Sequence, residues 1–303
     1  MTLKSFGFAL LLVAPVALSG CSTVKTSTPV EYASGFTFPE SPCFGPDGNL
    51  YLVNYKSTVV NKITPDGKVS IVVDTGYFNN GAIFDKKGNL YIASSGGKAI
   101  YKFDTSGKLT IAAAVSGGDS LLGPNDFAWS KNGDLYFTDP RGSDRKNLIG
   151  GVHRIRPNGS VIPFDRGLGY PNGIAFSLDG KSLFVDETSL DRLLKYKVNP
   201  DGSAGEKKVF IEFPKGSVCD GMKIDSKGNL WVVLHARAEI WGISPDGKVF
   251  HTVKVPAKYS TNFVFGGRDM KTAYVTAFDG WESPIGKILK IRMPIKGVSV
   301  GQK

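Results

Sequence analysis

The stretch YPNGIAFSLDGKSLFVDET (residues 170–188) contains the pattern that decides the fold. Apolar residues alternate with polar ones on both sides of an Asp-Gly pair at 179–180, and such a pair is a strong local indicator of a β-hairpin. The first strand opens with the turn-forming triplet Pro-Asn-Gly at 171–173. This triplet places one amide side chain at the start of the strand, and its meaning depends on how often the arrangement recurs.

The same hairpin recurs along the chain at intervals of 40 to 48 residues. In each unit a second hairpin follows it, as in ITPDGKVSIV at 63–72. Six units of four strands each predict an all-β, six-bladed β-propeller over residues 32–303. The segment near 30–38 is expected to close the ring as the outer strand of the last blade. The turn positions of the six first hairpins are Gly48, Gly88, Gly133, Gly180, Gly228 and Met270.

An open solenoid is the competing repeat architecture for a chain of this kind. It would need atypical polar repeats at its two ends, and the sequence has none. No segment has the 3.6-residue apolar periodicity of an amphipathic helix, whereas alternation such as LYLVN at 50–54 occurs throughout. The propeller is therefore favoured.

The N-terminus has the features of a bacterial export signal. Lys4 precedes an apolar stretch at 6–18 that is short for a membrane span. The tetrapeptide LSGC at 18–21 resembles the lipobox of bacterial lipoproteins, which implies a signal peptide at 1–20 and lipidation of Cys21. Residues 21–31 would then be a flexible tether. We expect a lipid-anchored protein of the cell envelope, on the periplasmic face of the outer membrane; a secretory signal with a chance cysteine is the alternative.

The charge and cysteine content place further bounds on function. The chain has 37 basic and 27 acidic residues and a net charge of +10, but the basic residues are scattered. A solvated surface explains this better than a nucleic-acid interface.

Cys43 and Cys219 lie in repeats that are not neighbours, so two buried free thiols are favoured over a disulfide, although the compartment would permit one. We expect a monomer.

A ring of oxygen-bearing side chains is predicted at one end of the central channel. The first strand of each blade lines this channel, so a residue at a constant offset from the turn recurs at the same end. The residue eight positions before each turn is always a carboxylate or carboxamide. Asn and Asp also favour strand-entry turns, which explains the asparagines but not the glutamate. The six residues are Glu40, Asn80, Asn125, Asn172, Asp220 and Asn262.

Such a set of oxygen ligands suits a hard cation. Two carboxylates with several amide oxygens favour Ca²⁺, with Mg²⁺, Mn²⁺ or Zn²⁺ as alternatives. Two acids that face each other across a narrow channel without a cation would repel and shift their pKa values. The sequence therefore predicts a divalent metal site at the channel mouth.

The second strands return to this mouth, so the residues that follow them should line it. His235 is the only histidine in that position, and an ordinary pKa of about 6.5 would suit proton transfer; a loop histidine with a satisfied hydrogen bond is the alternative. Arg141 would bind a substrate carboxylate or pair with Asp139 or Asp144. Tyr55, Asn80 and Asn262 are further candidates for substrate contacts at the mouth.

Several stretches together resemble the SMP-30/gluconolactonase family of six-bladed propellers. The resemblance covers nearly all of residues 32–295, and it implies metal-dependent lactone hydrolysis. It also places Glu40, Asn125, Asn172 and Asp220 on the metal-ligand positions, with Asp220 as a candidate general base. Ser41 departs from a common glycine. The matching stretches are FPESP (38–42), GPNDFAW (123–129), LYFTDPRG (135–142), GGVHRI (150–155), YPNGIAFSLDG (170–180), CDGMKID (219–225) and TNFVFGGRDMKTAYVT (261–276).

The functional prediction is a divalent-metal-dependent hydrolase of lactones or related esters, acting on a small-molecule substrate. The alternative is a non-catalytic propeller lipoprotein that binds a ligand or a protein and uses the metal structurally. A third class, metal-free propellers of the strictosidine-synthase-like or NHL type, conflicts with the four predicted ligands. An aspartate bound to a cation has a depressed pKa and is a weak base at neutral pH, so His235 is a second candidate for the catalytic base beside Asp220.

Overall fold

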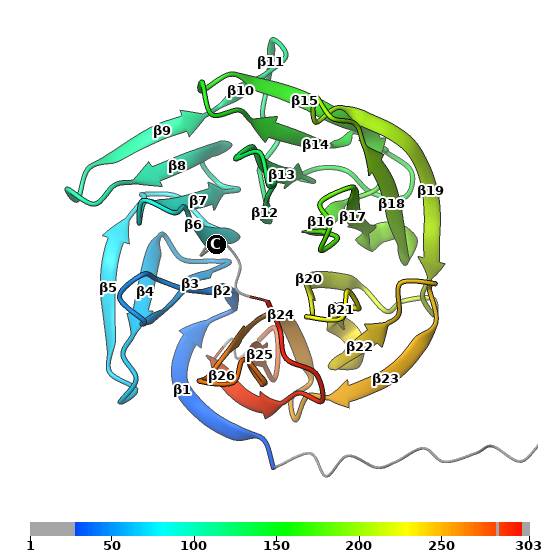
Figure 1. The fold of residues 1–303 in the computed structure, drawn as a ribbon. Coiled ribbons are helices and arrows are strands. Elements are labelled where there is room, and N and C mark those ends of the chain that lie inside the picture. Colours follow the sequence, from blue (N-terminus) through cyan, green and yellow to red (C-terminus); the bar gives the residue numbers. More distant parts are fainter. Residues whose placement is uncertain (1–27, 283–284, 299–303) are drawn as a thin grey trace, which may run out of the picture.

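The computed structural model describes residues 28–282 and 285–298 (Figure 1), which form a six-bladed β-propeller. Each blade is a four-stranded antiparallel sheet, and Figure 1 shows the first strand of each blade beside the central channel and the fourth at the rim. The fold predicted from the repeat is confirmed. Cys21 and the predicted signal peptide lie outside the described residues.

The first three blades follow one another in chain order. Blade 1 is β2 (Pro39–Phe44), β3 (Leu50–Asn54), β4 (Val59–Ile63) and β5 (Val69–Asp74). Blade 2 is β6 (Gly81–Phe84), β7 (Leu90–Ser94), β8 (Ala99–Phe103) and β9 (Leu109–Ala113). Blade 3 is β12 (Phe127–Trp129), β13 (Leu135–Asp139), β14 (Gly150–Ile155) and β15 (Val161–Leu168), after the small hairpin β10 (Val115–Ser116) and β11 (Asp119–Ser120).

The last three blades complete the circle. Blade 4 is β16 (Pro171–Phe176), β17 (Ser182–Glu187), β18 (Arg192–Val198) and β19 (Ala204–Glu212). Blade 5 is β20 (Cys219–Ile224), β21 (Leu230–Leu234), β22 (Glu239–Ile243) and β23 (Val249–Lys254). Blade 6 is β24 (Tyr259–Gly266), β25 (Thr272–Phe278) and β26 (Ile285–Arg292) with β1 (Val30–Thr37) outermost, and two short 3-10 helices are η1 (Thr188–Leu190) and η2 (His235–Arg237).

The ring is closed by the N-terminal strand, as expected from the sequence. Strand β1 pairs antiparallel with β26, from Val30 opposite Lys290 to Thr37 opposite Ile285. The first and last described strands therefore share one sheet, so opening the ring would require breaking that pairing. This closure fixes the six inner strands around one channel.

Aromatic side chains hold neighbouring blades together. Tyr136 in β13 packs edge-to-face on Phe176 in β16, with ring centroids 5.0 Å apart. Tyr51 and Phe84 make the same contact between blades 1 and 2, at 4.8 Å. Such pairs contribute roughly 0.5–1.5 kcal/mol beyond their buried area. Tyr51 and Tyr136, which belong to the second strands of their blades, therefore serve blade-to-blade packing.

Two local details agree with the sequence pattern. Met270 has a φ of 55°, in the left-handed region where the five equivalent turn glycines also lie, so the sixth hairpin keeps its geometry without a glycine. Cys43 and Cys219 are free thiols, as favoured above. Within residues 28–282 and 285–298, no helix is long and apolar enough to cross a membrane.

Candidate active site

The predicted ring residues lie where the inner strands begin. Glu40, Asn172, Asp220 and Asn262 belong to β2, β16, β20 and β24, whereas Asn80 directly precedes β6 and Asn125 lies two residues before β12. Asp220 is 8 % exposed and Asn172 is 7 % exposed. The strand pairing shifts register across the ring residue in β16, β20 and β24 and directly after it in β2. Such bulges re-aim side chains, so the turn-like triplets direct the polar groups toward the channel.

The glycine after the ring residue is required because neighbouring inner strands approach closely. A Cβ atom at Gly173 would lie 2.2 Å from the Asp220 carbonyl oxygen of the next blade. At Gly221 it would lie 2.1 Å from the Asn262 side chain. In blade 1 the position is Ser41, whose φ is 45° and whose Oγ accepts the Ala82 N–H of blade 2 at 3.1 Å. Serine thus makes a contact between the blades at the position of the common glycine.

Substituting Gly173→Ala should disturb the ring directly. The new Cβ must displace the Asp220 backbone, and overpacking of this kind costs about 1–3 kcal/mol. We expect Tm to fall by about 3–10 °C, as measured by differential scanning calorimetry. Gly280→Ala is the matched control because a Cβ there has no atom within 4 Å. An unchanged Tm in Gly173→Ala would contradict the role given to this contact.

Glu40 and Asp220 form the electrostatic centre of the ring. Burial raises the pKa of the Glu40 carboxyl well above its ordinary value, and the nearby Asp220 and Asp126 carboxylates raise it further. Burial also raises the pKa of Asp220, as does the charge of Asp126, while a hydrogen bond from the Asn172 side chain lowers it. Three of the four predicted ligands are thus in one electrostatic cluster.

The fourth predicted ligand is Asn125. Its side chain makes no hydrogen bond within the described residues, while its main-chain N–H donates to the Thr138 carbonyl at 2.8 Å.

A second set of charged residues, which the constant offset did not reveal, lies beside the ring. Asp126 Oδ2 accepts from the Asn262 amide at 3.5 Å, and Asp186 Oδ2 accepts from the Gly173 N–H at 3.2 Å. Lys223 donates to Asn262 Oδ1 at 2.9 Å, and its charge lowers the pKa of Glu40, Asp126 and Asp220. Three of these carboxylates, Glu40, Asp126 and Asp220, therefore share the neighbourhood of one ammonium group, and Asp186 lies near Asp126 and Asp220.

His235 lies beside Asp220, as the strand order predicts. Its Nδ1 is 3.0 Å from the Ser260 carbonyl oxygen and 3.7 Å from Asp220 Oδ2. The ring stacks on Tyr259 with centroids 5.1 Å apart and also lies near Trp281. Burial lowers the pKa of His235 to about 4. The expected pKa of about 6.5 is therefore wrong for this residue, because its imidazole lies among aromatic rings, and at pH 7 it is neutral and its Nδ1–H donates.

The depressed pKa of His235 predicts its behaviour in an NMR titration. Its ring resonances should show no protonation step between pH 5.5 and 8, since the imidazole stays neutral throughout that range. A His235→Gln variant assigns the signals among the three histidines of the chain. A midpoint near 6.5 for His235 would contradict the burial described above.

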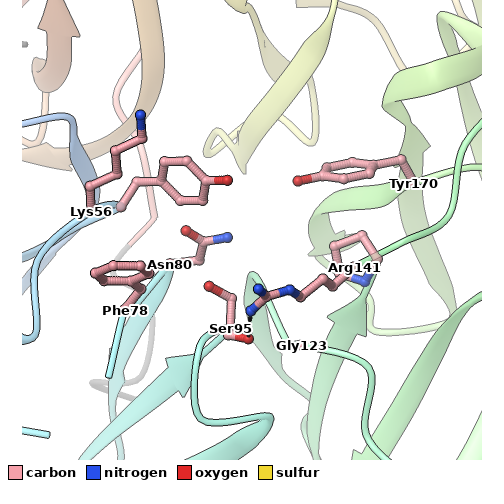
Figure 2. Close-up of a pocket in the computed structure, with 9 residues that line it drawn as sticks. Lys56, Phe78, Asn80, Ser95, Gly123, Arg141 and Tyr170 are labelled. Carbon is pink, nitrogen blue, oxygen red and sulfur yellow. Dashed lines mark hydrogen bonds between the residues drawn. The ribbon is translucent and has the colours of Figure 1, made fainter. Parts of the chain in front are cut away.

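A cavity of about 230 Å³ opens beside the ring, and Figure 2 shows its lining. Of the predicted mouth residues, Tyr55, Asn80 and Arg141 line it, together with Tyr170 and Ser95. Asn262 does not line this cavity, since its amide is bound to Asp126 and Lys223.

Arg141 pairs with neither Asp139 nor Asp144 among the described residues. Asp139 accepts from the main-chain N–H groups of Leu122 and Gly123. Asp144 accepts from main-chain groups of its own loop. Both carboxylates already have partners, so the Arg141 guanidinium is free of them and can bind a ligand in the cavity.

The donor set fits a hard divalent cation. No group of three or more His, Cys, Asp or Glu side chains arranged for a metal occurs in residues 28–282 and 285–298. The predicted set differs in kind, because two of its four members are carboxamides. Two adjacent buried carboxylates with raised pKa values carry repulsion that a cation would relieve. Oxygen donors with no thiol or imidazole among them favour Ca²⁺ over Zn²⁺.

Comparisons with known proteins find lactonases among the relatives of this chain. The family model of the SMP-30/gluconolactonase/LRE-like region matches residues 38–279. A gluconolactonase of Zymomonas mobilis is 29% identical over 288 residues, which cover 84% of this chain and 80% of that protein. The pentonolactonase XacC of Haloferax volcanii is 26% identical over 246 residues, covering 80% and 81%.

A solved structure shows the same fold. A gluconolactonase of Xanthomonas campestris is 23% identical and superposes with a TM-score of 0.75 over 87% of this chain and 89% of its own. The family model covers most of the propeller and includes all four predicted metal ligands. The chain therefore belongs to the SMP-30/gluconolactonase/LRE-like family.

Proposed function

We propose that this protein is a divalent-metal-dependent hydrolase of lactones or related esters. Its metal would be held by Glu40, Asn125, Asn172 and Asp220 at the channel mouth, and Ca²⁺ suits these oxygen ligands best. The observation that carries the proposal is the pair of adjacent carboxylates, Glu40 and Asp220, beside a polar cavity. The lactonases among the relatives support the same reaction class.

Hydrolysis of a lactone needs a polarised carbonyl and a water that loses a proton. A bound divalent cation supplies Lewis acidity toward the carbonyl oxygen and lowers the pKa of a water. Asp220 is the residue that takes the proton on its carboxylate. Burial and the charge of Asp126 raise its pKa, which opposes the lowering that a bound cation would cause.

Two further residues lie near the proposed base. His235 donates its Nδ1–H to the Ser260 carbonyl and lies beside Asp220, whose Oδ2 is 3.7 Å from that nitrogen, so it packs against the base without a hydrogen bond to it. Burial raises the pKa of Tyr170, so its hydroxyl stays protonated at neutral pH and can donate a hydrogen bond to the substrate. Tyr55 lines the same cavity.

The proposal is tested by metal analysis combined with lactone turnover. We expect the mature domain to bind one divalent ion, to lose lactonase activity on chelation, and to regain it with Ca²⁺, Mg²⁺, Mn²⁺ or Zn²⁺. A panel of sugar and aliphatic lactones with a chromogenic ester covers the reaction class. Metal binding and stabilisation without turnover of any member would reject the hydrolase and favour a ligand-binding propeller.

We also propose that the protein acts as a monomer in the cell envelope, anchored through a lipid on Cys21. The lipobox-like sequence at 18–21 supports this placement. Labelling with radioactive palmitate should mark the wild-type chain but not Cys21→Ser. Equal labelling of both chains, or of neither, would reject the anchor.

A further inference from the structure

We propose that Arg141 binds an oxyanion group on the substrate, so that the preferred lactone carries a carboxylate, sulfonate or phosphate remote from its reacting carbonyl. This inference rests on the proposed lactone hydrolysis and names its substrate class. Three features of the cavity beside the ring support this assignment, namely its charge, its free hydrogen-bonding groups and its position.

The cavity lining is basic and polar. None of its nine residues is acidic, and two of them, Arg141 and Lys56, are basic. In Figure 2 the Arg141 guanidinium extends into the cavity beside Ser95, whereas the Lys56 ammonium points away from Arg141. Lys56 lies over the Phe38 ring, 4.9 Å from its centroid. Arg141 is therefore the cation presented to a ligand.

Arg141 is held in place but keeps free donors. Its Nη1 donates to the Ser95 carbonyl oxygen of blade 2 at 2.5 Å. The aliphatic part of the Arg141 side chain packs against Gly123, where an added Cβ atom would lie 2.7 Å from Arg141 Cδ. Within the described residues no carboxylate oxygen lies within 4.0 Å of the guanidinium, and no other acceptor binds it. A guanidinium has five N–H donors in a planar fork, and such a group binds oxyanions with two parallel hydrogen bonds.

A second polar group in the cavity also lacks a partner. Asn80 is 6 % exposed, and its Oδ1 is buried without a hydrogen bond in the structure. Asn80 lines the same cavity as Arg141. Buried acceptors are nearly always satisfied in folded proteins, so a substrate hydroxyl that donates to this oxygen would satisfy it once the amide turns toward the cavity. The cavity thus calls for a ligand with both an anionic group and a hydroxyl group.

The anion-binding residue and the proposed reaction centre are adjacent. Tyr170 lines the cavity, and the charges of Glu40, Asp220 and Arg141 all act on its hydroxyl. A small ligand near Tyr170 can therefore be near the two acids and Arg141 together. The cavity is smaller than the roughly 300–1,000 Å³ of typical ligand pockets, which favours a substrate with a single ring.

A matched pair of lactones tests the inference. Glucono-1,4-lactone and glucaro-1,4-lactone differ only at carbon 6, where the second carries a carboxylate. We expect the wild-type enzyme to prefer the glucarolactone about tenfold or more in kcat/KM, since a charge-assisted hydrogen bond supports that ratio. In Arg141→Gln the KM for glucarolactone should rise about tenfold or more, with a smaller change in its kcat, and the preference should disappear.

A control variant separates local binding from bulk charge. Arg156→Gln removes the same charge from an exposed turn of the same blade, and it should keep the preference. A wild-type preference for the neutral lactone would overturn the inference. So would an equal loss of kcat on both lactones in Arg141→Gln, because that result would place Arg141 at the reacting carbonyl shared by the pair.

Failure of the proposed function can be distinguished from failure of the inference. If neither lactone is hydrolysed, the hydrolase proposal fails, and the two intact lactones then serve as ligands in calorimetry. Tighter binding of glucarolactone that is lost in Arg141→Gln would still support the anion site. Equal affinity for the two lactones would reject it.

Discussion

An Asp220→Asn variant is expected to lose about 10²–10⁴-fold in kcat/KM for a lactone while keeping part of its calcium affinity. The carboxamide retains an oxygen that can bind a cation, but it cannot accept a proton at neutral pH. Steady-state kinetics on the calcium-loaded variant, with calorimetry for the metal, would separate the two effects. The result would distinguish the metal-binding role of Asp220 from its role as a base.

A matched change elsewhere in the blade controls for the substitution itself. Asp246→Asn alters an exposed turn between β22 and β23 of blade 5, and its kinetics should resemble those of the wild type. Undiminished turnover in calcium-loaded Asp220→Asn would show that another group takes the proton. His235 would then be the next residue to examine.

Removal of the metal should destabilise the protein increasingly as the pH rises. The pKa values of Glu40, Asp126, Asp186 and Asp220 are raised in the folded state. Each group therefore keeps its proton in the fold at pH values where it is ionised in the unfolded chain. Stability of the metal-free fold falls as the pH rises from about 4 toward these raised values. A bound cation favours the ionised carboxylates and opposes that fall.

We expect the difference in Tm between calcium-loaded and chelated protein to grow from pH 5 to pH 8. With calcium at about 100 times its Kd, linkage contributes about 2.7 kcal/mol, which corresponds to about 5–10 °C for a chain of this size. Differential scanning calorimetry across the pH range would measure it. In Glu40→Gln the difference should shrink, because one of the coupled carboxylates is gone. A difference that does not change with pH would contradict the clustering of these acids.

The fold and the ring followed from the sequence because both depend on a local pattern that repeats. Each turn position, including Met270, fixes a hairpin, and a constant distance back along the strand reaches a ring residue. Six copies of a weak local signal therefore gave a strong global one. The outer position of β1 (Val30–Thr37) was also predicted. The second hairpin expected in the sixth unit, however, supplies only β26, and β1 takes the place of its other strand.

The second set of charged residues had no such signal. Asp126 and Asp186 occupy different positions within their blades, and only blade 5 has a lysine at the position of Lys223. No constant distance from the hairpin turn therefore links these three residues. Their proximity depends on the bulges at the start of the inner strands and on how the blades meet. Only three-dimensional packing reveals them.

The properties of the two mouth residues also depended on tertiary contacts. The pKa of His235 is set by burial against Tyr259 and Trp281 from the neighbouring blade. The freedom of Arg141 depends on Asp139 having main-chain partners and on the Ser95 carbonyl of blade 2. A sequence names such residues as candidates, but their protonation and their partners come from surroundings far away in the chain.

The central claim, that the ring holds one divalent cation, is tested most directly by anomalous diffraction from crystals loaded with Mn²⁺. We predict one strong peak at the channel mouth, coordinated by oxygens of Glu40, Asn125, Asn172 and Asp220, and a weaker peak in crystals of Glu40→Gln loaded in the same way. A fully loaded crystal with no peak at the ring, or with its only ordered ion elsewhere, would contradict the account.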